Sequence, residues 1–144
     1  MTSMLARVMV VDYGGVLALA PAFDDPVAQA RGMLADGPSL TGALLRERAR
    51  SWRVKAEAGR YVLDSFALLA YLENEAGADR VTALLAAVQQ GEAAVWMSIV
   101  NYGEVVYITQ REQGFFAAQR VIAALDQLPM VVVAAGRTRP TVPN

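Results

Sequence analysis

The stretch RYVLDSFALLAYL, residues 60–72, joins a short apolar run to an apolar helical pattern, with one acid, Asp64, at the junction. The run has the length of a buried strand, and the residues after Asp64 are typical of a helix. A strand that leads directly into a helix is the repeating unit of α/β proteins, in which strands lie parallel. Asp64 can cap the helix, or its carboxylate can bind a metal ion, and both roles can coexist.

The same alternation continues toward the C-terminus. Helices are predicted over residues 65–77, 78–91, 99–114 and 115–128, and further strands over residues 92–98 and 129–135. Most of these helical patterns end at a glycine, a common helix stop. Strands separated by helices predict an α/β fold, with a short parallel sheet covered by helices on both faces.

The N-terminal part has a different pattern. Residues 4–19 read as two short strands around a glycine turn, which predicts a β-hairpin. The pair Asp25-Pro26 favours a helix start, and Ser39 is a suitable cap for a second, basic helix. The predicted units are a hairpin and helical arm over residues 1–58, an α/β unit over 59–135 and a disordered tail over 136–144.

The composition limits the chemistry. The 144 residues include no Cys and no His, which excludes a Ser-His-Asp triad, a thiol nucleophile and an ordinary zinc site. Catalysis would use carboxylates that hold a hard cation such as Mg²⁺. No apolar run reaches the roughly 18 residues of a membrane span. Without Cys there is no sign of secretion, so we expect a cytoplasmic protein that is not bound to a membrane. The net charge of −1 gives no general attraction to nucleic acid.

Glu104 is the second acid of interest. On a helix it is stacked with Val100 and Ile108, so it lies on or beside the apolar face. An unpaired carboxylate is costly there, and we expect a basic side chain or a metal ion as its partner. The other acids of this region fall at helix ends or on polar faces and are predicted to be solvated: Glu73, Glu75, Asp79, Glu92 and Glu112.

Residues 60–133 resemble the PIN-domain nucleases, in particular the VapC-type toxins of toxin–antitoxin pairs. The stretches YVLDSFALLAYL and AVWMSIVNYGEVVYITQREQG carry the resemblance. It implies a PIN-like α/β/α three-layer core and acids that bind Mg²⁺ or Mn²⁺ to cleave RNA. Asp64 and Glu104 match the first two acid positions and are the expected catalytic and metal residues, with Ser98 and Asn101 as supporting residues.

The family pattern continues with two more strands and a third acid, usually followed by a fourth. Here the last acid is Asp126, and nothing after it matches. The C-terminal part of the PIN domain is therefore missing from the pattern. Two carboxylates predict weak cation binding and little or no ribonuclease activity.

Residues 7–55 resemble the end of an AbrB- or VapB-type antitoxin, whose toxin-wrapping helix carries a basic run. The matching run contains Arg46, Arg48 and Arg50. The resemblance implies an arm that places arginines beside Asp64 and Glu104, within one chain or between the two chains of a homodimer. The short linker from Ala56 to Gly59 makes a sharp return within one chain difficult and favours exchange between two chains. The beginning of the antitoxin DNA-binding domain has no counterpart, so DNA binding is not expected.

Three functions follow from these observations. The first is an impaired, metal-dependent endoribonuclease fused to an antitoxin-like arm. The second is a catalytically inactive module for toxin–antitoxin interaction or dimerisation. The third is a structural fold without a surviving site. The missing third acid argues against catalysis and so favours the last two functions. The resemblance favours the first as the origin of the chain.

Overall fold

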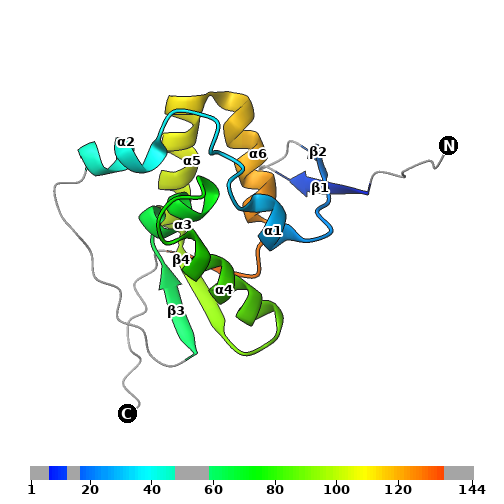
Figure 1. Cartoon of the computed structure of the whole chain (residues 1–144). Coiled ribbons are helices and arrows are strands. Elements are labelled where there is room, and N and C mark those ends of the chain that lie inside the picture. Colours follow the sequence, from blue (N-terminus) through cyan, green and yellow to red (C-terminus); the bar gives the residue numbers. More distant parts are fainter. Residues whose placement is uncertain (1–6, 13–16, 48–58, 135–144) are drawn as a thin grey trace, which may run out of the picture.

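The computed structural model describes residues 7–12, 17–47 and 59–134, which form a mixed α/β structure (Figure 1). The elements are β1 (Val8–Asp12), β2 (Leu17–Pro21), α1 (Pro26–Ala30), α2 (Leu40–Glu47), β3 (Arg60–Leu63), α3 (Ser65–Leu72), α4 (Ala78–Gln89), β4 (Ala94–Ser98), α5 (Ile99–Gln113), α6 (Phe115–Leu125) and β5 (Val131–Val133). The predicted alternation of strands and helices after residue 59 is therefore confirmed. The predicted tail, residues 136–144, lies outside the described residues.

Strands β1 and β2 form the predicted antiparallel hairpin, in a register that places Val8 opposite Pro21. The turn between them lies outside the described residues. The hairpin contacts the rest of the molecule through α6, where Ala20 is buried beside Ala123. The first strands of the chain are thus joined to one of its last helices (Figure 1).

The next two helices start where the sequence predicts. The carboxylate of Asp25 accepts a hydrogen bond of 3.2 Å from the backbone N–H three residues later, and Pro26 occupies the first turn of α1. The hydroxyl of Ser39 accepts a bond of 3.1 Å from the N–H of Gly42 at the start of α2. Between the helices, Gly32 adopts a φ of +72°, a left-handed conformation that glycine allows at little cost.

The other three strands form one parallel sheet in the order β3-β4-β5. Leu63 of β3 lies opposite Met97 of β4, and Trp96 of β4 lies opposite Val131 of β5. Helices α3 and α4 connect the first pair of strands, and α5 and α6 connect the second pair. Both connections step across the sheet in the same direction. Because such connections are right-handed, they place their helices on the same face.

The burial of the strands agrees with this arrangement. Leu63, Val95 and Met97 point to one face and are buried in the core. Val62 and Val131 belong to the other face and are 56% and 55% exposed. The described residues therefore do not form the three-layer arrangement expected from the sequence. In this part of the chain, no further strand and helix return across the sheet to cover its second face.

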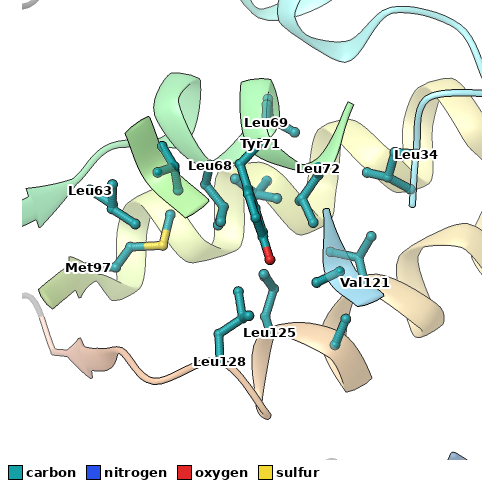
Figure 2. Packing of buried hydrophobic residues seen from close by; sticks show 14 of the residues in the cluster. Leu34, Leu63, Leu68, Leu69, Tyr71, Leu72, Met97, Val121, Leu125 and Leu128 are labelled. Carbon is teal, nitrogen blue, oxygen red and sulfur yellow. The ribbon is translucent and has the colours of Figure 1, made fainter. Parts of the chain in front are cut away.

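A single hydrophobic core joins the two predicted units (Figure 2). Leu34, Leu40 and Leu44, which precede β3, are buried together with side chains of α3, α5 and α6. The side chain of Tyr71 extends from α3 toward Leu125 of α6 at the centre of this core (Figure 2). The helical part of residues 1–58 thus contributes core side chains to the α/β unit.

The hydroxyl of Tyr71 donates a hydrogen bond to the backbone carbonyl of Val27 in α1. Tyr71 is fully buried. Burial, with a smaller contribution from the carboxylate of Asp25, raises the pKa of Tyr71 well above its usual range, and Arg31 opposes the shift. The phenol therefore remains a neutral donor to α1.

Polar contacts from the segment after α1 also hold α3 at its C-terminal end. The N–H of Gly32 donates to the carbonyl of Tyr71 at 3.0 Å, and the N–H of Leu34 donates to that of Leu72 at 2.9 Å. The bond to Leu72 satisfies a carbonyl of the last helical turn, where carbonyls lack the usual helical partner, and the bond to Tyr71 adds to the one that its carbonyl accepts from the N–H of Asn74. The segment after α1 therefore completes the end of α3.

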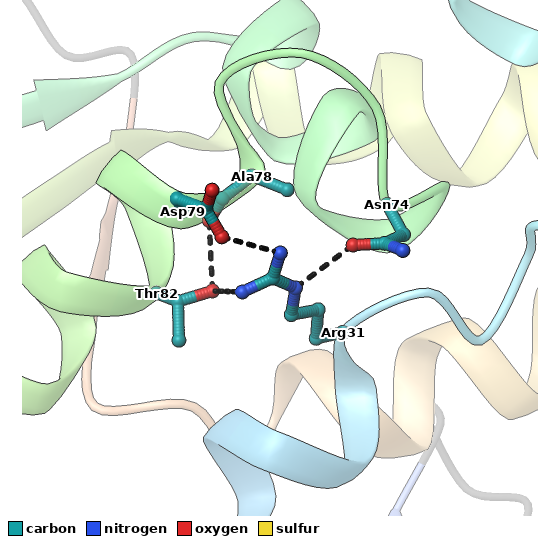
Figure 3. A network of polar contacts seen from close by, with 5 residues as sticks. All are labelled: Arg31, Asn74, Ala78, Asp79 and Thr82. Atoms are coloured by element: carbon teal, nitrogen blue, oxygen red, sulfur yellow. Dashed lines mark hydrogen bonds and ion pairs between the residues drawn. The ribbon is translucent and has the colours of Figure 1, made fainter.

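Arg31 adds a polar network beside these bonds (Figure 3). Its guanidinium donates to Asn74 at 2.9 Å, to Thr82 at 3.2 Å and to Asp79 at 2.6 Å. Asp79 is largely exposed, so this ion pair alone adds little stability. The network instead fixes the turn between α3 and α4 against the segment after α1.

Glu73, which the sequence predicted to be solvated, is buried. Its two carboxylate oxygens accept hydrogen bonds from the backbone N–H groups of Leu40 at 2.6 Å and Thr41 at 3.0 Å. These groups form the N-terminus of α2, where a negative charge is favourable. The prediction was wrong because the partner of Glu73 lies about thirty residues earlier in the chain, beyond the reach of local periodicity.

We expect Glu73→Ala to lower the free energy of unfolding by about 2–3 kcal/mol, because it leaves two buried donors without an acceptor. Chemical denaturation measures the change. The matched control is Glu92→Ala, an exposed acid that should change stability by less than about 0.5 kcal/mol. Equal effects of the two substitutions would contradict the capping role of Glu73.

Tyr71→Phe should cost about 1–2 kcal/mol at neutral pH, because the Val27 carbonyl loses its donor. The folded-state pKa of Tyr71 is raised, so its contribution is complete below the unfolded-state pKa of about 10. It decreases at higher pH, because there the unfolded tyrosine ionises while the folded one stays protonated. Denaturation of both proteins across this range should show a shrinking difference; a constant difference would contradict the shift.

Candidate functional site

Asp64 lies at the carboxyl end of β3 and caps α3. Its Oδ1 accepts a hydrogen bond of 2.8 Å from the N–H of Ala67, and its backbone is extended, with φ of −93° and ψ of 173°. The side chain is half-buried. The capping role considered from the sequence is therefore confirmed. It uses Oδ1 and leaves Oδ2 for another interaction.

Glu104 is half-buried on α5, and its carboxylate is directed to the start of α3. The hydroxyl of Ser65 donates a hydrogen bond to Oε2 of Glu104. The same hydroxyl lies 3.3 Å from the backbone carbonyl of Asn101. Ser65 directly follows Asp64 in the chain, so this contact brings the Glu104 carboxylate to the end of β3 at which Asp64 lies.

Ser65 was not among the site residues predicted from the sequence, although it is fully buried and connects α3 to α5. The available signal was its position directly after Asp64, at the junction of strand and helix. A buried hydroxyl at that junction needs a partner from another element. Glu104 is that partner here.

Ser98 and Asn101 lie at the same end of the sheet as Asp64, where the carboxyl ends of the parallel strands meet. Since Leu63 lies opposite Met97, the next residues along the two chains, Asp64 and Ser98, lie side by side at the carboxyl ends of β3 and β4. Ser98 caps α5, and its hydroxyl accepts a hydrogen bond of 3.1 Å from the N–H of Asn101. Ser98 and Asn101 thus set the start of the helix that carries Glu104.

The start of α3 and the start of α5 lie at this one edge. Backbone N–H groups at helix starts favour negative charge. Carboxyl ends of parallel strands are also the usual place for ligand sites in α/β sheets. The arrangement therefore suits a pair of carboxylates that bind a cation or a polar ligand.

Within residues 7–12, 17–47 and 59–134, no cluster of three or more acids, His or Cys is placed to hold a metal ion. Asp126, the last acid of the sequence, is exposed after α6, where its carboxylate accepts a bond of 3.2 Å from the hydroxyl of Tyr102. Asp64 and Glu104 are thus the acids that the structure brings to this edge.

The predicted arm is only partly described. Arg46 is in the last turn of α2 and is exposed, whereas Arg48 and Arg50 lie outside the described residues. Helix α2 packs on α3 and α5 of its own chain, with Leu44 buried and Leu45 58% exposed. The start of the arm therefore docks within one chain. Deleting residues 1–58 would remove core side chains together with the arm.

The chain matches no known family model, no curated protein and no solved structure. The helices of the described segments include none that is both long and apolar enough to cross a membrane.

Two substitutions separate the capping role of Asp64 from any role of its charge. Asp64→Ala removes the cap of α3 and should cost about 1 kcal/mol of stability. Asp64→Asn keeps a side-chain oxygen at the cap and should stay within about 0.5 kcal/mol of the wild type. Thermal unfolding of both variants measures this. An Asn variant as unstable as the Ala variant would mean that the charge, and not the cap, supports the fold.

Proposed function

We propose that this protein is a PIN-type, metal-dependent endoribonuclease of low activity, fused behind an antitoxin-like arm. One observation supports the proposal above the others. The hydrogen bond between Ser65 of α3 and Glu104 of α5 brings the Glu104 carboxylate toward Asp64. Both acids then lie at the end of one parallel sheet where the carboxyl ends of its strands meet. These are the acids that the resemblance assigns to catalysis, Asp64 and Glu104.

The residues at this edge fit a hard cation, because their donors are carboxylate, hydroxyl and amide oxygens. Asp64 and Glu104 would hold Mg²⁺ or Mn²⁺, with Ser98 and Asn101 beside them. Such an ion supplies an activated water and neutralises charge on a phosphodiester. With two carboxylates, most of its coordination remains water, so we propose weak binding. RNA is the proposed substrate and the cytoplasm the proposed location.

The protein's own groups have defined parts in this proposal. The hydroxyl of Ser65 holds the Glu104 carboxylate at the start of α3. Ala67 holds Asp64 through Oδ1, which orients Oδ2 for a ligand. The proposed antitoxin-like arm, with Arg46, Arg48 and Arg50, would cover the acids, because a guanidinium pairs with a carboxylate and can replace a cation electrostatically.

The second candidate function is an inactive module for toxin–antitoxin interaction. One observation favours it. The described residues bring two acids to this end of the sheet, and no third acid among them completes a metal-binding group. In this case the fold presents surfaces to a partner and carries out no hydrolysis.

We expect Mn²⁺ titration by calorimetry to show weak binding that Asp64→Asn and Glu104→Gln each weaken by about tenfold or more. Both substitutions keep a neutral oxygen donor, so the loss reports on charge. Glu92→Gln, an exposed acid away from this edge, is the matched control and should bind as the wild type does.

The same four proteins, incubated with a panel of RNAs with and without Mn²⁺, test the activity. Slow, metal-dependent cleavage by the wild type and the control alone would support the nuclease. Metal binding without cleavage would favour the interaction module. Binding that both substitutions leave unchanged would exclude the edge as the metal site.

A further inference from the structure

Strand β3 lies at an open edge of the sheet that the described strands form. Among the described strands it pairs with β4 alone. The carbonyl of Gly59 accepts a bond of 2.9 Å from the N–H of Ala94, so residue 59 and every second residue after it point their backbone groups toward β4. The backbone N–H and C=O groups of Arg60 and Val62, and the N–H of Asp64, therefore point away from β4, whereas the C=O of Asp64 accepts a hydrogen bond from the N–H of Leu68 in α3.

Such an edge is a template for another strand unless the chain protects it. β3 contains no proline, and its backbone stays extended through Asp64, which lengthens the edge by one residue beyond Leu63. Val62, in the middle of this edge, is 56% exposed. Arg60 is also exposed, and its guanidinium lies 5.4 Å from the ring centre of Trp96 on the same face.

We propose that β3 pairs with β3 of a second copy of this chain, antiparallel and with Val62 opposite Val62. Around a twofold axis, opposed residue numbers must then add to 124. Arg60 of one protomer thus lies opposite Asp64 of the other, twice in the dimer. The residues paired in this register, 60, 62 and 64, are the ones whose backbone N–H groups point to the open edge, and the C=O groups of 60 and 62 point there too.

Charge complementarity selects both the second copy and this register. Residues that lie opposite each other in an antiparallel pair have their side chains on the same face of the sheet. Because the faces alternate along each strand, the numbers of two opposed residues can add only to an even sum. A sum of 120 places Arg60 opposite Arg60, and a sum of 122 places it opposite Val62. Only the sum of 124 pairs each Arg60 with an Asp64, through Oδ2, while Oδ1 still caps α3.

This inference rests on the backbone geometry of β3 and does not require the proposed nuclease. It has one consequence for the proposed metal site. In the dimer, Arg60 of the second protomer lies beside Asp64 and competes with a cation for its carboxylate. Metal binding and dimerisation should then oppose each other.

A complementary pair of charge variants tests the register on the full-length chain. In a dimer of the Arg60→Glu variant, an acid at position 60 would lie opposite Asp64 twice. In a dimer of the Asp64→Lys variant, Arg60 would lie opposite a basic residue at position 64 twice. Each variant alone should dimerise on the order of tenfold more weakly than the wild type. A mixture of the two satisfies every pair in a heterodimer and should restore dimerisation. Sedimentation velocity measures all three samples, after circular dichroism has confirmed that each variant is folded.

Cross-linking provides a second test that does not depend on the stability of Asp64→Lys. The chain has no cysteine, so one introduced thiol is unique. Opposed residues of a hydrogen-bonded antiparallel pair have Cα atoms about 5.5 Å apart, within the range of a disulfide. Val62→Cys should therefore form a covalent dimer on mild oxidation. Val131→Cys, equally exposed on the same face but located on β5, is the matched control and should not.

Val62→Pro completes the set. It removes an N–H that points to the open edge and leaves the β3–β4 ladder intact, so it should give a folded monomer. A wild-type chain that sediments as a monomer would overturn the proposal. So would equal cross-linking of the two cysteine variants, or a Val62→Pro protein that remains a dimer.

Discussion

The right-handed path of the connections between β3, β4 and β5 determines most of what this structure exposes and hides. Because both connections step in the same direction, α3 to α6 cover one face of the sheet and bury Val95 and Met97. The same constraint leaves Val62 and Val131 on an exposed second face, and the strand order places β3 at an edge of the sheet that the described strands form. It also brings the starts of α3 and α5 to one end of the sheet.

The helical layer is completed from an earlier part of the chain. Leu34, Leu40 and Leu44 fill its core, and backbone N–H groups after α1 satisfy the last carbonyls of α3. The buried Glu73 carboxylate in turn caps α2. These contacts depend on one another, because α3 supplies the acid that starts α2 while the segment before α2 completes α3. Helices α1 and α2 and the α/β unit therefore form one interdependent structure.

Local chemistry made much of the fold predictable from the sequence. Asp25, Ser39 and Asp64 each cap a helix, as their type and their place before a helical pattern predicted. Ser98 also caps a helix, a role that was not predicted for it. The contact that brings Glu104 to Asp64 was less accessible, because it depends on Ser65 and on the packing of α5 beside α3. The burial of Glu73 could not be predicted, since its partners are backbone groups of a distant segment. The exposed second face depends on topology, which periodicity does not report.

The shared core has a consequence for a chain that is cut between residues 47 and 59. The two pieces would remain joined by the buried contacts of Leu34, Leu40 and Leu44, by the hydroxyl of Tyr71 on Val27, and by Arg31 on Asp79. None of these contacts requires a continuous backbone. The protein should therefore behave as a split pair, in which the first piece, added as a separate peptide, restores the fold of the second.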